Sequence, residues 1–179
     1  TGSVKKLMVQ MAVPALVGQV VNLLYNIVDR IYIGHIPEIG DLALTGVGVC
    51  LPIIMIVSAV ASLVGSGGAP RASIAMGEKK TEDAEKILGN CFFLQIIVSV
   101  ILTAALLIFN RPLLLAFGAS ENTIEYACDY MNIYAIGTVF VQLTLGMNSF
   151  VTAQGYSKIA MLSVVIGAAT NIALDPLFI

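Results

Sequence analysis

The chain has 179 residues, of which 58% are hydrophobic and 11% are charged, and its mean hydropathy is +0.94. Ordinary globular domains are about half apolar and a quarter charged, so this composition excludes a water-soluble surface. The net charge of −2 and the few, dispersed basic residues also exclude a nucleic-acid-binding protein, because such proteins need a basic patch.

Long stretches without charge predict membrane helices. The first apolar stretch follows Lys5 and Lys6 like a signal peptide, but it continues to Gly34 without a cleavage site, so it is interpreted as a membrane helix. Residues 42–70, 87–110 and 130–157 contain no charged side chain. Since about 20 apolar residues span a bilayer, the sequence predicts an all-α, polytopic transmembrane helix bundle. Five helices are expected, at about residues 7–34, 42–74, 84–109, 124–152 and 159–179.

Turn-forming residues separate these helices. The predicted connections cover residues 35–41, 77–80, 110–122 and 154–158. The glycine-rich segment 65–71 lacks the lysine and hydroxyl of a phosphate-binding loop, so it predicts close helix packing and a helix end.

The distribution of Lys and Arg predicts the orientation. With alternating helices, seven basic residues lie on one side: Lys5, Lys6, Arg71, Lys79, Lys80, Lys86 and Lys158. Only Arg30 and Arg111 lie on the other side. Basic residues are retained inside, so a cytoplasmic amino terminus in the inner or plasma membrane is expected. The fifth helix is barely completed at Ile179, and we therefore expect the chain to be a fragment.

Two aspartates of the predicted membrane helices are candidates for function, because ionisable groups at membrane depth are costly and mark functional sites. Asp29 lies near the external end of the first helix, and an interfacial carboxylate paired with Arg30 or a lipid headgroup remains an alternative. Asp175 lies near the external end of the fifth helix between apolar neighbours.

Each aspartate belongs to a polar stripe. The stripe on the first helix has spacings of 3, 4 and 3 and comprises Gln19, Asn22, Asn26 and Asp29. The stripe on the fifth helix recurs every four residues and comprises Ser163, Gly167, Asn171 and Asp175. Carboxylate and carboxamide oxygens can hold a hard cation or share a proton. Because both helices run in the same direction, the stripes predict one proton or sodium switch in the outer half of the bundle.

Three prolines lie inside apolar runs, namely Pro14, Pro52 and Pro176. Each removes a backbone hydrogen bond, and both a structural kink and a bend used in transport remain open. Cys50, Cys91 and Cys128 lie in separate segments without metal-ligand spacing, so buried thiols and no cofactor are expected.

Four segments resemble the multidrug and toxic compound extrusion (MATE) family. They are PALVGQVVNLLYNIVDRIYIG, GSGGAPRASIAMGEKK, AQGYSKIAML and NIALDPLFI, in this order along the chain. MATE proteins contain two six-helix lobes, so the resemblance implies that residues 1–179 are five helices of the amino-terminal lobe. The sixth helix and the carboxy-terminal lobe are then absent from the chain.

The resemblance also implies a function: export of organic, often cationic, drugs driven by inward H⁺ or Na⁺. It implies that Asp29, Asn171 and Asp175 bind the coupling ion, and that they are metal ligands only if Na⁺ couples. Tyr130 and Tyr134 are both candidates for a tyrosine that some members use. Gln19, Asn22 and Asn26 are further cavity-lining candidates.

Two other functions remain as alternatives. A lipid-linked saccharide flippase of the same superfamily should carry Arg and Lys at mid-membrane to hold phosphates, and this chain has none there. A non-transporting membrane scaffold or an enzyme leaves the polar stripes unexplained, and no nucleophile and base pair supports catalysis. The expected partners are therefore drugs, membrane lipid and the missing lobe, while the sequence leaves the ion and the substrate unidentified.

Overall fold

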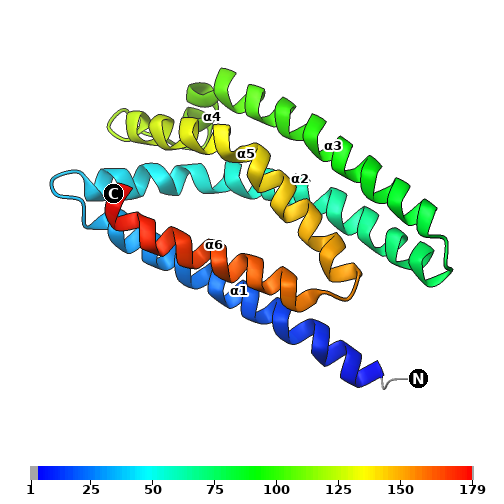
Figure 1. The fold of residues 1–179 in the computed structure, drawn as a ribbon. Helices are drawn as coiled ribbons and strands as arrows, with labels where there is room; N and C mark the ends of the chain where they lie inside the picture. The colour runs from blue at the N-terminus through cyan, green and yellow to red at the C-terminus, as the bar shows by residue number, and fades with distance from the viewer. Residues whose placement is uncertain (1–3, 179) are drawn as a thin grey trace. The chain divides into compact units, whose positions relative to one another are not determined.

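The computed structural model describes residues 4–178, except for the side chains of residues 4, 6, 7 and 175–178. The described elements are all helices: α1 (Val4–Gly34), α2 (Gly40–Gly77), α3 (Thr81–Ile108), α4 (Asn110–Ala116), α5 (Ile124–Ala153) and α6 (Ser157–Phe178) (Figure 1). Five of them, all except α4, are long and apolar enough to cross a membrane. The predicted all-helical membrane fold is thus confirmed, and the chain is a multi-pass membrane protein.

Two elements differ from the sequence prediction. The glycine-rich segment lies inside α2, which continues through Pro70 and ends at Gly77, three residues beyond the expected end at about residue 74. The third connection is not wholly a loop, since α4 occupies its first half. Proline is tolerated in the first turn of a helix, so Pro112 is compatible with α4, and the fully buried Leu114 anchors it. Gly118, with a φ of 100°, follows the end of the helix.

The helices divide into two compact units, which are described separately. Unit 1 comprises residues up to 37 and from 151 onward and contains α1 and α6. These two helices lie side by side and run in the same direction (Figure 1). Near their amino-terminal ends the Ser157 hydroxyl donates to the carbonyl of Gln10, at 3.5 Å. This hydrogen bond fixes which levels of the two helices are adjacent.

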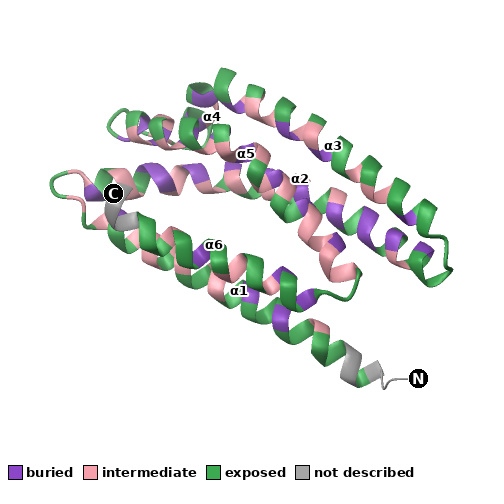
Figure 2. Cartoon of the chain, in the orientation of Figure 1, coloured by how far each residue is buried: buried purple, intermediate pink, exposed green. Residues whose placement is uncertain are grey.

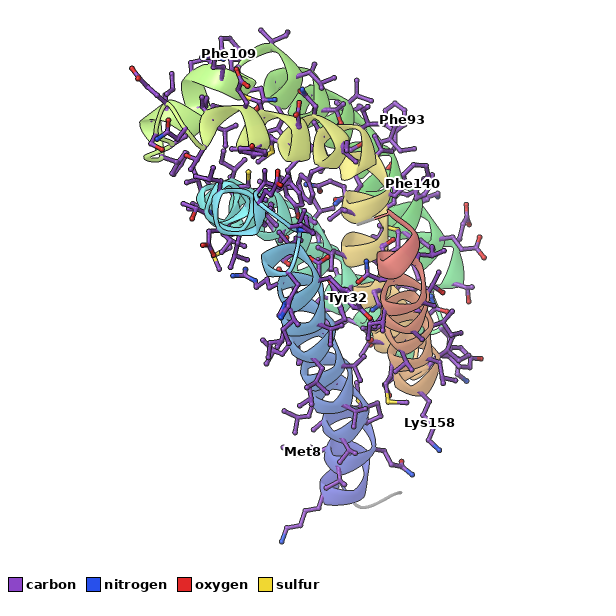
Figure 3. All side chains as sticks on the ribbon, turned by 90° about the vertical axis from the view of Figure 1, so that its left-hand side faces the viewer. Met8, Tyr32, Phe93, Phe109, Phe140 and Lys158 are labelled. Atoms are coloured by element: carbon purple, nitrogen blue, oxygen red, sulfur yellow. The ribbon has the colours of Figure 1, made fainter. Side chains whose placement is uncertain are left out.

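Unit 2 comprises residues 38–150 and contains α2, α3, α4 and α5. Its apolar core consists of Cys50, Ile53, Val57, Leu106, Leu114, Ile124, Ala127, Met131 and Ala135. Buried residues are spread along α2, whereas much of α3 is exposed (Figure 2). Phe93 and Phe140 are 65% and 73% exposed and project outward from their helices (Figure 3). An exposed apolar surface of this kind is suited to contact with lipid chains.

Glycines allow α2 to approach its neighbours closely in unit 2. A Cβ on Gly65 would lie 2.7 Å from Ser149 Oγ and 2.8 Å from the carbonyl oxygen of Gly146. A Cβ on Gly68 would lie 2.5 Å from the Cys91 sulfur and 2.7 Å from Phe150 Cζ. Small residues drive helix association in membranes because they bring backbones together, and the glycine-rich segment performs this role as predicted.

A buried glutamine pair connects three helices of unit 2. The Gln95 side-chain amide donates to the backbone carbonyl of Gln142 at 2.8 Å and to its Oε1 at 2.6 Å. The Gln142 amide donates in turn to the carbonyl of Val57 at 2.8 Å. Both glutamine side chains are fully buried. These bonds link α3, α5 and α2 and were not anticipated from the sequence.

Replacing Gln142 with leucine is expected to lower the free energy of unfolding by about 1–3 kcal/mol, because Gln95 loses a buried partner. The Gln95→Leu, Gln142→Leu double variant should lose less than the sum of the single variants, since it leaves no orphaned amide. Reversible unfolding in detergent micelles measures these differences. Gln154→Leu is the matched control, because Gln154 is exposed. Strictly additive losses would show that the two side chains do not stabilise each other.

Candidate functional site

The polar stripe on α1 is only partly buried. Asn22, Asn26 and Asp29 are half-buried, whereas Gln19 is exposed. The Asn26 amide nitrogen donates to the carbonyl of Asn22, one turn earlier, at 2.7 Å. This bond uses the amide nitrogen of Asn26 as the donor. The amide oxygen of the same side chain can therefore accept a hydrogen bond or bind a cation. The half-buried carboxylate of Asp29 lies one turn further along α1.

Asn171 provides an unsatisfied acceptor on α6. The residue is half-buried, and its Oδ1 atom is buried without a hydrogen-bond partner among the described residues. An unsatisfied buried acceptor is costly, and such groups in native proteins are explained by an ion, water or function. Ser163 and Gly167 from the predicted stripe are exposed instead. The Ser163 hydroxyl donates to the carbonyl of Ala160, in its own helix, at 2.7 Å.

The register of unit 1 brings the polar residues of α1 and α6 to similar levels. At 1.5 Å per residue, Asn26 lies about 24 Å beyond Gln10, and Asn171 lies about 21 Å beyond Ser157. Asp29 lies about 29 Å beyond Gln10 on the same scale. Asp29, Asn26 and Asn171 therefore occupy neighbouring turns of two adjacent, parallel helices.

Asp175 lies within α6, but its side chain lies outside the described residues. Its backbone is about 27 Å beyond Ser157, which is close to the level of Asp29. The predicted role of Asp175 in ion binding therefore stays a prediction. Among the described side chains, no group of three His, Cys, Asp or Glu residues could hold a metal ion.

The two candidate tyrosines belong to unit 2. Tyr130 and Tyr134 are half-buried on α5 and pack against the apolar core of that unit. Near them the Asn110 amide donates to the carbonyl of Cys128 at 3.1 Å and to Asn132 Oδ1 at 2.7 Å. These bonds attach the start of α4 to α5. Which tyrosine lines a cavity stays open, as it does in the sequence.

Comparison with known proteins places this arrangement among transporters. A family profile described as MatE matches residues 14–177. The chain is 25% identical over 177 residues to the multidrug export protein MepA of Staphylococcus haemolyticus (strain JCSC1435), covering 99% of this chain and 39% of that protein. It is 26% identical over 174 residues to the FAD transporter of Shewanella oneidensis, covering 97% of this chain and 38% of that protein.

A solved structure agrees with the sequence comparison. It is described as the outward-facing conformation of a multidrug resistance MATE family transporter of the MOP superfamily. The TM-score is 0.90 and the sequence identity is 28%, with 99% of this chain and 39% of that chain covered. The chain thus spans less than half the length of these relatives.

Proposed function

We propose, since this chain belongs to the MatE family of membrane transporters, that it is the amino-terminal lobe of a secondary antiporter. The antiporter exports organic compounds and is driven by inward H⁺ or Na⁺. The main support is the half-buried carboxylate of Asp29 and the unsatisfied oxygen of Asn171 on adjacent, parallel membrane helices. The sixth helix and the second lobe would be supplied from outside this chain.

In this proposal the coupling ion and the exported compound alternate. A charged Asp29 carboxylate at membrane depth is costly, so binding of H⁺ or Na⁺ lowers the energy of the bundle. Asp175 would provide the second carboxylate, and the Asn171 oxygen would complete the ligand set for Na⁺ or accept a hydrogen bond from a protonated acid. Gln19, Asn22 and Asn26 would line the polar path that leads to this pair.

The excess of basic residues at one end of the helices supports a cytoplasmic amino terminus in the cell membrane. The composition of α1 and α6 also bears on the cargo. Residues 8–29 and 159–174 contain no Lys or Arg. This favours a cationic or neutral compound over a phosphate-bearing one, although one relative is named an FAD transporter. A flippase for phosphate-linked saccharides is the less favoured alternative for the same reason.

The test reconstitutes the full-length natural protein into liposomes and imposes a proton gradient and a sodium gradient separately. Ethidium represents organic cations, FAD represents the anionic alternative, and a fluorescent lipid-linked saccharide reports flipping. We expect one gradient to drive ethidium transport and the matching ionophore to abolish it. Transport at the same rate with and without either gradient would contradict an antiporter. Gradient-driven transport of FAD, without transport of ethidium, would contradict a cationic cargo.

A further inference from the structure

A cleft of ≈ 470 Å³ lies in unit 2 at the turn between α2 and α3. Its volume falls in the range of about 300–1,000 Å³ that small ligands occupy. Part of its lining is apolar and comes from Ile74, Ala75 and Ile87. The cleft therefore presents both apolar and charged surface to one occupant.

Some of the charged residues that line the cleft form ion pairs, and others do not. Both lysines that line the cleft are paired: Lys80 with the lining residue Glu78 at 2.7 Å, and Lys86 with Glu82 at 3.0 Å. Arg71 and Asp83 also line the cleft, and neither side chain has a hydrogen bond or ion pair with another described residue. A cation and an anion thus remain available together in one cleft, which suits an occupant that carries both charges.

The cleft also lies at the level of lipid headgroups. Arg71 is the first charged residue after the uncharged stretch 42–70, and Lys86 is the last one before the uncharged stretch 87–110. From Asp41 to Arg71 the helix is about 45 Å long, close to the thickness of a bilayer including its headgroup regions. Arg71 and the cleft that it lines therefore fall at the boundary between lipid and water.

The net charge of residues 71–90 argues against a lipid whose headgroup carries a net negative charge. Residues 71–90 contain four basic side chains, Arg71, Lys79, Lys80 and Lys86. They also contain four acidic side chains, Glu78, Glu82, Asp83 and Glu85. Polybasic clusters attract anionic headgroups, whereas a balanced region does not favour net negative charge.

We infer that this cleft binds the headgroup of a phospholipid that carries a primary ammonium, of the phosphatidylethanolamine type. The Arg71 guanidinium pairs with the phosphate, as its donor geometry favours. The Asp83 carboxylate accepts hydrogen bonds from the ammonium, which a choline headgroup cannot donate. Ile74 and Ile87 contact the glycerol and the first acyl carbons.

Native mass spectrometry of the full-length protein with ethanolamine, choline and glycerol phospholipids of identical acyl chains tests this inference. We expect the ethanolamine lipid to be retained about threefold more strongly than either of the others, the scale of one exposed charged contact. Equal retention of all three, or stronger retention of the anionic glycerol lipid, would overturn the assignment. This comparison needs only the wild-type protein.

Variants then assign the two contacts. Asp83→Asn should reduce retention of the ethanolamine lipid to that of the choline lipid, and Arg71→Gln should weaken retention of all three. Glu85→Gln, near the start of α3, and Lys79→Gln, between α2 and α3, are matched controls, because both residues are exposed and do not line the cleft. Asp83→Asn behaving like Glu85→Gln would place the ammonium elsewhere and overturn the inference.

Discussion

Asp29→Asn is expected to reduce ion-driven export to the leak rate of protein-free liposomes. The substitution keeps the size of the side chain but removes the charge that attracts H⁺ or Na⁺. Loss of a hydrogen bond or contact to a charged group weakens binding by about 10- to 100-fold, so the same gradient no longer loads the site. Gradient-driven efflux from proteoliposomes measures the change.

Two further variants make this prediction specific. Asp29→Glu keeps a carboxylate one methylene longer and should retain part of the coupled transport. Asp41→Asn makes the same chemical change at an exposed residue in the first turn of α2 and should transport like wild type. Binding of ethidium to purified Asp29→Asn protein reports whether it is folded. Wild-type efflux by a folded Asp29→Asn protein would show that this carboxylate is interfacial or structural.

The membrane fold was predictable because bilayer thickness sets the length of uncharged helices. The ends of the helices were less predictable, since glycine and proline near residues 65–71 are typical of both turns and close packing. In α2 they serve packing, and the helix continues to Gly77. The short helix α4 was missed because its stability comes from burying Leu114, a tertiary contact that a seven-residue pattern does not reveal.

The polar stripes were only partly predictable, for a geometric reason. Residues spaced by four drift around a helix by about 40° at each step, and residues spaced by three drift by about 60° in the opposite direction. Gln19 is therefore rotated by about 80° from Asp29, and Ser163 by about 80° from Asn171. In the structure Gln19 and Ser163 are exposed, whereas Asp29 and Asn171 are half-buried.

The buried glutamine pair could not be derived from periodicity. Gln95 and Gln142 lie in different helices, 47 residues apart, and their pairing depends on how α3 and α5 pack. The available signal was a glutamine in the middle of each of two long uncharged stretches. Such a residue needs a hydrogen-bond partner at membrane depth, but the sequence does not identify the partner.

Gly65→Ala is expected to destabilise the protein by about 1–3 kcal/mol, because the added methyl group overpacks the contact between α2 and α5. The new Cβ would lie 2.8 Å from the carbonyl oxygen of Gly146, which is backbone and cannot rotate away. The helices must therefore separate locally. The bond from the Gln142 amide to the carbonyl of Val57 joins the same two helices and should lengthen.

Gly67→Ala is the matched control, two residues along the same helix. Gly67 is exposed, and a Cβ there would meet nothing within 4 Å, so the change should be neutral or stabilising by up to about 1 kcal/mol. Unfolding in detergent micelles compares the two variants. Adding Ser149→Gly to Gly65→Ala removes the other close contact, at 2.7 Å, but leaves the Gly146 carbonyl in place. We therefore expect only partial recovery, and complete recovery would show that the serine side chain alone limits the approach of α2 to α5.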